Sequence, residues 1–598
     1  MPVAVAPLAD GSALLCDLAP DGGPAAAAVR VDDLPSAIAA RERSGRVRWV
    51  WESAARCYPQ LLAAGLRVAR CHDIALVEAL LLGRDGRHRE PAALTAAWGR
   101  LHAGEPEQAA SPATSAAQQA AAQQDAAQQA AAQQAADAPS VRPGAVPSGG
   151  QQALFEPAGY RLTGAELLDA LTAVHADQLA RIAADEAPAR LRLLAAAESA
   201  GALAAAEMSF DGLPWRPDVH DELLAGLLGP RPARGSRPRR LAELAAQISA
   251  AFGGRPVNPD SPAQLVRAFA AEGIPVASTR SGVLRGVDHP AVPLLLEYKE
   301  LARLHTAHGW AWLDAWVAGG RFRPEYVVGG VVSGRWASNG GGALQIPRVL
   351  RRAVIADPGW TLVVGDAAQL EPRVLAALAG DRAFAEAAAA GDLYTELAGA
   401  FGGDRAKAKV ALLSAMYGGA GGEAGQLLAV LRRRFPVAAE YVESAARAGE
   451  EGRVVRSVLG RSCPPPSAAW RSLAAGSGDP GAARSVRARG RFTRNFVVQA
   501  SAADWALVLL ACLRPRLAAL GPAGAPGTAG SAGPGDGRPH LVFFQHDEVM
   551  VHCPEGLAGP VVEAVGAAAT EAGRLVFGAT PVRFPVTTAV VSCYADAK

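Results

Sequence analysis

A tract of low complexity from residue 105 to 152 divides this chain of 598 residues into two unequal parts. Pairs of glutamine recur there every five residues among alanines, beginning at Gln118, Gln123, Gln128 and Gln133. A five-residue period matches neither the repeat of a helix nor that of a strand, so the tract offers no face to bury. We interpret it as a linker, and we expect several folded domains rather than one.

The composition of the chain leaves its partners open. Half of the residues are hydrophobic, which is enough for large cores, and the formal net charge is only +2. Weak basicity neither requires nor excludes a nucleic acid, so local charge must decide. The seven cysteines form no C-x-x-C pair, which argues against a zinc site. We see no signal peptide and no apolar run long enough for a membrane span, so a cytoplasmic protein without a membrane partner is expected.

Residues 1–104 have the pattern of a small α/β unit. The apolar runs Ala13–Cys16 and Val47–Trp51 predict strands. The segments Pro59–Gly65 and Ile74–Leu82 predict helices.

Residues 153–598 begin with long patterns rich in alanine and leucine, which predict helices up to about residue 320. Mixed strands and helices follow to the end. A second insert, from Gly521 to Gly537, is nearly all Gly, Pro, Ala and Ser and predicts a surface loop. The fold class expected is therefore multidomain, combining α/β and α+β parts.

Acidic residues stand at two predicted strand ends. Asp366 follows the apolar run Thr361–Val364, and Asp547 and Glu548 lie between two apolar runs that predict a hairpin. Seen alone, Asp366 could be a helix N-cap and the second segment a polar turn. If the two strand ends meet, their carboxylates could hold a pair of divalent ions, which stabilise both the attacking and the leaving oxygens of phosphoryl transfer.

Two stripes of residues at four-residue spacing lie between these acidic segments. Because residues four apart share one face of a helix, each stripe forms a row. The first row runs through Arg405, Lys409, Leu413 and Tyr417, with no acidic neighbour in the same helix, and its order of cations and aromatic suits a nucleotide. The second runs through Arg491, Asn495 and Gln499, residue types that bind phosphates, sugars or base edges.

Arginines cluster near these stripes, at residues 432–434 and at five positions between 484 and 494. Each stripe alone could be an ordinary polar helix face. Local basic clusters of this kind nevertheless favour binding to the phosphate backbone of a nucleic acid.

Together, these segments resemble the motifs of family A DNA polymerases, the DNA polymerase I-like group. The family's D-Y-S-Q-I-E-L-R, R-x-x-x-K-x-x-x-[FY]-x-x-x-Y-G, R-x-x-x-N-x-x-x-Q and V-H-D-E motifs match residues 366–373, 405–418, 491–499 and 545–548. Upstream, SGRWAS with Arg335 and LQIP with Gln345 resemble T-G-R-L-S-S and L-Q-N-I-P. The order and approximate spacing agree from about residue 154 to the end.

The resemblance implies a right-hand polymerase with palm, fingers and thumb. The thumb is expected at about 219–315, the fingers at about 379–499 and the palm in the remainder of 153–598. The palm would hold two Mg²⁺ ions, with Mn²⁺ as a possible substitute. Asp366 and Asp547 would be their ligands together with the backbone carbonyl of Ala367, and Glu548 would support them.

The same resemblance implies roles for the remaining motif residues. Arg405 and Lys409 would bind the triphosphate, Tyr417 would lie near the templating base pair, and Glu371 would block a ribose 2′-hydroxyl. Gln369 and Leu413 would also lie at the incoming nucleotide. Primer or template DNA would be contacted by Arg335, Gln345, Arg491, Asn495, Gln499 and His546. The activity implied is template-directed addition of deoxynucleotides to a primer 3′-hydroxyl by a monomer.

The sequence departs from the family pattern at several positions. Ala367 and Ala368 replace Tyr and Ser, and Leu413 replaces an aromatic residue. Tyr394 stands where the family commonly has a phosphate-binding histidine. These changes leave the metal ligands intact but bear on nucleotide affinity and sugar discrimination.

The N-terminal unit resembles a degenerate 3′–5′ exonuclease domain of the RNase H-like, α/β type. A two-metal nuclease needs several carboxylates at one point, and residues i and i+2 of a strand share a face. Here Asp17 is followed by Ala19 instead of a second acid, and Asp73 suits a helix N-cap better. We therefore expect no proofreading.

Two other functions remain open from the sequence. A single-subunit RNA polymerase would share the palm chemistry, although Glu371 argues against it. A non-catalytic DNA-binding scaffold derived from a polymerase would be marked by loss of Asp366 or Asp547, and both are present.

Overall fold

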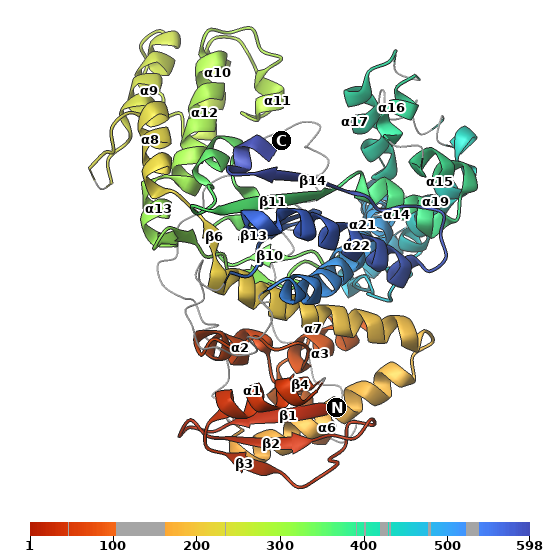
Figure 1. The fold of residues 1–598 in the computed structure, drawn as a ribbon. Coiled ribbons are helices and arrows are strands. Elements are labelled where there is room, and N and C mark those ends of the chain that lie inside the picture. Colours follow the sequence, from red (N-terminus) through yellow and green to blue (C-terminus); the bar gives the residue numbers. More distant parts are fainter. Residues whose placement is uncertain are drawn as a thin grey trace.

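The computed structural model of the protein describes residues 1–102 and 162–597, except for 46, 234, 390–391, 400–401, 419–428, 430–431, 477–479 and 522–536. The predicted linker and most of the predicted loop at 521–537 therefore lie outside the described residues. Figure 1 shows an N-terminal unit below a larger body, in which two groups of helices rise at opposite ends of a central sheet.

A five-stranded sheet forms the middle of the N-terminal unit. Its order is β3-β2-β1-β4-β5, with β2 antiparallel to both neighbours and the pairs β1–β4 and β4–β5 parallel. The strands are β1 (Pro2–Pro7), β2 (Ala13–Asp17), β3 (Val29–Val31), β4 (Arg48–Trp51) and β5 (Cys71–Asp73).

Helices cover both faces of this sheet. They are α1 (Leu34–Ser44), α2 (Ala54–Ala63), α3 (Ile74–Arg84), α4 (Leu94–His102), α6 (Gly164–Ala183) and α7 (Pro188–Asp211). Alternate residues of a strand point to opposite faces. Accordingly, Val3 and Val5 of β1 belong to a core with Tyr58 of α2, whereas Ala4 and Ala6 belong to a second core with Leu171 of α6.

The N-terminal unit thus extends beyond the linker. The sequence placed its boundary at 104, where low complexity begins, but α6 and α7 pack on the sheet from the other side of that tract. The low-complexity tract shows only where the regular hydrophobic pattern stops. It does not show which segments on its two sides pack into the same core.

The helix α2 begins earlier than predicted. Pro59 suggested a helix start because proline favours the first helical turn. In the structure α2 begins at Ala54, so Pro59 lies inside it. Four of its residues are buried, and this packing outweighs the local cost of the proline: Ala54, Tyr58, Leu61 and Leu62.

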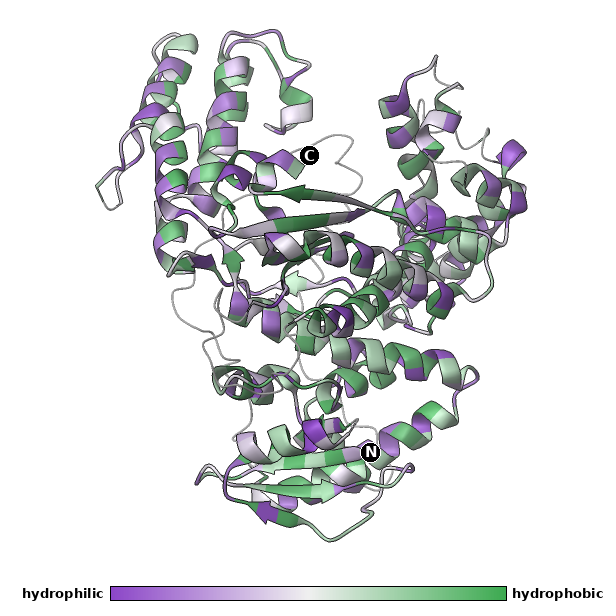
Figure 2. Ribbon diagram, in the orientation of Figure 1, coloured by the Kyte–Doolittle hydropathy of each residue, from purple (hydrophilic) through white to green (hydrophobic). Residues whose placement is uncertain are grey.

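A four-stranded antiparallel sheet forms the centre of the body. Its order is β12-β13-β11-β14, from β11 (Trp360–Ala367), β12 (His540–Gln545), β13 (Glu548–Pro554) and β14 (Val586–Val591). The long helix α21 (Pro480–Ala519) packs against α22 (Ala558–Phe577) beside it. Hydrophobic residues gather on these strands and helices in Figure 2.

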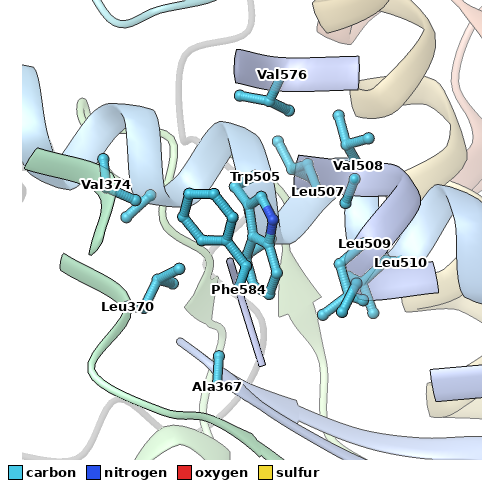
Figure 3. Close-up of a cluster of buried hydrophobic side chains, with 14 of the residues drawn as sticks. Ala367, Leu370, Val374, Trp505, Leu507, Val508, Leu509, Leu510, Val576 and Phe584 are labelled. Carbon is cyan, nitrogen blue, oxygen red and sulfur yellow. The ribbon is translucent and has the colours of Figure 1, made fainter. Parts of the chain in front are cut away.

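One core cluster lies directly behind the end of β11 (Figure 3). The ring of Trp505, from α21, is fully buried and its centroid is 5.7 Å from that of Phe584. Ala367 and Leu370 complete this side of the cluster, at the end of β11 and the start of α14 (Leu370–Ala379). The core therefore fixes the backbone on both sides of the loop that follows Asp366.

Helix α21 also corrects an expectation about membranes. Among the described residues it is the one helix long and apolar enough to span a bilayer, although no apolar run of that length was expected from the sequence. However, 89% of its apolar window is buried inside the protein. Core helices share this composition, so α21 is weak evidence for a membrane.

Two helical groups flank the central sheet. One contains α8 (Pro217–Leu228), α9 (Arg239–Ala251), α10 (Pro262–Ala271), α11 (Ser281–Leu284), α12 (Ala291–His308) and α13 (Trp310–Trp316). The other contains α15 (Arg382–Ala389), α16 (Leu393–Ala398), α17 (Arg405–Met416), α19 (Pro436–Glu450) and α20 (Ala468–Ala474). Short strands connect the first group to the centre, namely β6 (Leu213–Pro214), β7 (Val317–Ala318), β8 (Arg321–Phe322), β9 (Tyr326–Val327) and β10 (Ala337–Ser338).

Candidate active site

The two acidic segments meet at one end of the central sheet. Asp366 of β11 is directly opposite Glu548 of β13, and the N–H of Ala367 donates to the carbonyl oxygen of Asp547 at 2.9 Å. His546 and Asp547 form the two-residue turn between β12 and β13, where His546 has a φ of 56°. Such a positive φ is typical of tight hairpin turns, which project their side chains from the tip.

The sequence suggested that Asp366 follows its strand. In the structure Asp366 lies within the strand, β11. The predicted apolar run ended at Val364, and the next residue, Gly365, is of a type that is depleted in strands. The strand continues because Gly365 pairs with Val549 and Thr588 on its two sides. A Cβ at Gly365 would lie 2.9 Å from Cγ1 of Val586, so the crowded neighbours require glycine here.

Carboxylates accumulate at this end of the sheet. The pKa of Asp547 is raised to about 7 by burial and by the nearby negative charges of Asp366 and Glu371. Glu548 is 3% exposed and accepts a hydrogen bond from the hydroxyl of Tyr594. The site therefore has more negative than positive charge, and a divalent cation would relieve the repulsion between the carboxylates.

The donor set offers a divalent ion few protein ligands. Within the described ranges, no group of three His, Cys, Asp or Glu side chains forms a complete metal cage. Asp366 and Asp547 offer two carboxylates, and the backbone next to them adds carbonyl oxygens. Magnesium keeps several waters and is commonly bound by one or two carboxylates together with substrate phosphates, which matches this set.

Glu371 connects three other predicted residues. Its Oε1 forms an ion pair with Arg335 and its Oε2 accepts a hydrogen bond from the Tyr417 hydroxyl. Tyr417 also interacts with Gln499 of α21. Residues assigned separately to nucleotide and DNA are thus held together, and the position of the Glu371 carboxylate is fixed from both sides.

Asp392, which the sequence analysis did not single out, organises the region next to α17. It caps α16 by accepting from the N–H groups of Tyr394 and Thr395, at 2.9 and 3.4 Å. It also accepts from the side chains of Gln369 and Arg405. The stripe interpreted as unpaired is therefore partly paired, by an acid from another helix. An aspartate just before a helical run was the available signal.

Tyr394 lies beneath the two predicted triphosphate-binding cations. The Cζ of Arg405 is 5.5 Å and the Nζ of Lys409 is 5.9 Å from the centre of its ring. Such distances allow cation–π attraction. The aromatic ring therefore orients both cations on one side of α17, while Leu413 packs against the main core.

Comparison with known proteins identifies the family. Residues 234–590 match the family model for DNA polymerase family A. The chain belongs to DNA polymerase family A. It is 29% identical over 319 residues to a thermostable DNA polymerase I of Thermus filiformis, covering 47% of this chain and 34% of that protein. It is 27% identical over 394 residues to that of Thermus aquaticus, covering 58% and 43%. The chain thus spans less than half of these relatives.

A solved structure of the POL domain of Pol1 from M. smegmatis, in complex with DNA primer-template and dNTP, has a similar fold. The TM-score is 0.66 at 19% sequence identity, covering 100% of this chain and 95% of that chain. At this identity the likeness concerns the fold alone. It confirms the family A polymerase fold expected from the sequence.

In this family A chain, several arginines predicted to bind DNA have structural partners instead. Arg494 is buried and paired with Glu443, which also pairs with Arg432 at 2.8 Å. Arg489 donates to the carbonyl oxygen of Pro464 at 2.7 Å. The basic cluster is therefore only partly available to phosphates. Sequence alone could not separate these roles, because the acidic partner lies on α19.

The remaining predicted DNA contacts are placed as follows. Arg491 is exposed at the near end of α21, and Asn495 is half-buried one turn further along. Gln345 is exposed on a short 3-10 helix, Ala343–Gln345. Beside it, Gln545 donates to the carbonyl oxygen of Leu344 at 2.6 Å, which ties this segment to the end of β12.

Proposed function

We propose that this chain is a template-directed DNA polymerase that adds deoxynucleotides to a primer 3′-hydroxyl. The observation that carries the proposal is the meeting of Asp366 and Asp547 at one end of the central sheet. Membership of family A and the polymerase-domain fold support it.

In this proposal Asp366 and Asp547 hold two Mg²⁺ ions, with the carbonyl of Ala367 as a further ligand. Such ions make the 3′-hydroxyl nucleophilic and neutralise the leaving pyrophosphate. Glu548 stays oriented by the Tyr594 hydroxyl. Arg405 and Lys409 bind the triphosphate, for which Arg405 exchanges its pairing with Asp392 for a phosphate oxygen.

A primer-extension assay tests the proposed activity. The protein is incubated with a labelled primer on a longer template, four deoxynucleotides and Mg²⁺. We expect lengthening of the primer to the end of the template. Binding of the duplex without lengthening, in either Mg²⁺ or Mn²⁺, would instead favour the DNA-binding scaffold.

Lys409→Ala should lower kcat/KM for nucleotides by roughly tenfold or more, because a charged hydrogen bond to the triphosphate is lost. The affinity for primer-template alone should barely change. Lys407→Ala is the matched control, since residues two apart on a helix do not share a face. A Lys409→Ala variant that loses DNA affinity but keeps its nucleotide kinetics would place Lys409 in the duplex groove.

Glu371→Ala should raise the ratio of ribonucleotide to deoxynucleotide incorporation by roughly tenfold, because the space beside the sugar is no longer blocked. The ratio is measured for the parent and the variant by competition between the two nucleotides in single-turnover extension. Glu386→Ala is the control, because Glu386 is an exposed residue of α15. An unchanged ratio would remove Glu371 from sugar selection, and efficient use of ribonucleotides by the parent protein would favour an RNA polymerase.

We further propose that the N-terminal unit is an RNase H-like, exonuclease-type unit without nuclease activity. Its three-layer arrangement around a mixed sheet supports the first part. For the second, Asp17 is paired with Arg41, and Asp73 caps α3 by accepting from the N–H of Leu76 at 3.0 Å, as predicted.

A mismatched primer incubated with Mg²⁺ or Mn²⁺ and no nucleotides should therefore keep its length. One paired and one capping carboxylate cannot together hold two metal ions against a phosphodiester. The assay is repeated with Asp547→Asn to exclude reversal of synthesis. Shortening that persists in that variant and disappears in Asp17→Asn or Asp73→Asn would reveal a working nuclease site.

A further inference from the structure

A loop of the polymerase body, residues 453–463, is held by the N-terminal unit. Arg84 of α3 donates to the carbonyl oxygen of Gly460 at 3.4 Å. Nε2 of His88 lies 3.0 Å from the carbonyl oxygen of Ser462. Arg456 forms an ion pair with Glu186, between α6 and α7. Three contacts from one unit thus fix both ends of what we call the 453–463 loop.

The other side of the 453–463 loop rests on α21. The N–H of Val458 donates to Oγ of Ser501 at 2.9 Å, and the N–H of Leu459 donates to Asp504 at 3.2 Å. The loop is therefore clamped between the N-terminal unit and the core helix of the body.

Arg461 projects from this clamped loop into a buried ion cluster. It pairs with Glu198 of α7 and lies 3.5 Å from Asp504 of α21. The side chains of Arg461, Glu198 and Asp504 are 11, 3 and 0% exposed. Two buried carboxylates of separate helices thus fix the position of one guanidinium, and one of those helices, α7, packs between the N-terminal sheet and the body.

The guanidinium of Arg461 supports the turn that carries Arg335. A Cβ at Gly334 would lie 2.3 Å from Nε of Arg461, and Gly334 has a φ of 84°. The turn is closed by hydrogen bonds from Gly334 N–H to Val331 at 2.8 Å and from Val331 N–H to Arg335 at 3.1 Å. Only glycine both adopts this φ readily and allows such close contact.

Arg335 follows directly and reaches Glu371, whose other oxygen accepts from Tyr417. A continuous chain of contacts therefore runs from the N-terminal unit to Glu371. We propose that Arg461 is a positioning residue for the Arg335–Glu371 pair, and that the N-terminal unit acts through the 453–463 loop to sharpen sugar selection by the polymerase site. This inference rests on the proposed polymerase function.

The first test loosens the clamp from the N-terminal side, in the full-length protein. Arg84→Met removes the contact with Gly460 and the ion pairs with Asp185 and Glu186. Arg67→Met is the matched control, because Arg67 also pairs with a buried acid of this unit, Asp211 at the end of α7, but has no recorded contact with the loop.

Two quantities are measured in these variants. We expect the ratio of ribonucleotide to deoxynucleotide incorporation to rise roughly twofold to thirtyfold in Arg84→Met, the range typical of couplings through packed networks. Deuterium uptake by the amides of residues 331–336 should rise as well. Both should stay at the parent level in Arg67→Met. No rise in uptake, or equal changes in the two variants, would overturn the inference.

The second test places Arg461 and Glu371 on one path. Arg461→Lys keeps the charge but loses the planar fork that meets two carboxylates. Introduced alone, Arg461→Lys should raise the ratio of ribonucleotide to deoxynucleotide incorporation. Combined with Glu371→Ala, it should raise that ratio no further, because effects along one path are not additive. Effects that multiply would overturn the proposal. If the parent protein extends no primer, the proposed function fails, and the deuterium uptake of Arg84→Met alone decides whether the loop holds the turn.

Discussion

Asp547→Asn should lower the rate of primer extension by at least roughly a hundredfold to a thousandfold, the usual cost of removing one charge-stabilising group at a reacting centre. In the proposed function Asp547 shares two cations with Asp366, and a neutral amide cannot replace its carboxylate there. Binding of primer-template should change little, because the substitution adds no bulk and breaks no side-chain ion pair of Asp547 that the structure records. Single-turnover extension and fluorescence anisotropy measure the two quantities.

Asp596→Asn is the matched control for this experiment. Asp596 is an exposed aspartate near the end of the chain, and its substitution should leave extension unchanged. An Asp547→Asn protein that still extends at more than a tenth of the parent rate would show that Asp547 is not a metal ligand.

Arg514→Met should destabilise the protein by about 3 to 5 kcal/mol, as expected when one partner of a buried ion pair is removed. Arg514 donates two hydrogen bonds to Glu207, at 2.7 and 2.8 Å, and one to the carbonyl oxygen of Ala69 at 2.9 Å. Tyr58 donates to the same carboxylate at 2.5 Å. The side chains of Arg514 and Glu207 are 12 and 9% exposed, so the variant leaves a negative charge with little access to water.

Denaturant unfolding measures this effect, with Arg516→Met as the control. Arg516 lies on the same helix and pairs with Glu571, but both side chains are 34% exposed. Its loss should cost less than about 1 kcal/mol, as for surface pairs. If the free energy of unfolding falls by similar amounts in the two variants, the Arg514–Glu207 network does not stabilise the contact between the N-terminal unit and α21.

The sequence predicted the acidic hairpin well because its signals are local. The apolar runs Leu541–Phe544 and Val549–Val551 specify a hairpin with acidic residues near its tip. The structure shortens the turn to His546 and Asp547 and places Glu548 in β13. The strand of Asp366 was predicted for the same reason, although its end was placed too early, at Val364. The strand continues because Gly365 pairs with Val549 and Thr588, residues about two hundred positions away.

Partners that come from distant segments could not be predicted. The pairing of Arg405 with Asp392, of Arg494 with Glu443 and of Arg335 with Glu371 depends on how helices and loops pack. Spacing along one helix identifies which residues share a face. It does not identify what that face meets, which is why a stripe interpreted as free for phosphate is partly occupied.

The sequence placed α6 and α7 in the second part of the chain, residues 153–598, and missed their packing on the N-terminal sheet for a related reason. Their patterns are helical wherever they pack, and the low-complexity tract suggested a domain boundary. Only the contacts of Leu171 with one face of the sheet and of Leu203 with the other place them in this unit.

Incorporation of single nucleotides opposite each of the four template bases tests the central claim most directly. The parent protein, Mg²⁺ and one deoxynucleotide at a time are mixed with four primer-templates that differ only in the first unpaired base. Template-directed polymerisation predicts that each template selects its complementary deoxynucleotide and that Asp547→Asn loses all four additions. Addition that ignores the template base, or no addition with any of the four, would contradict the account.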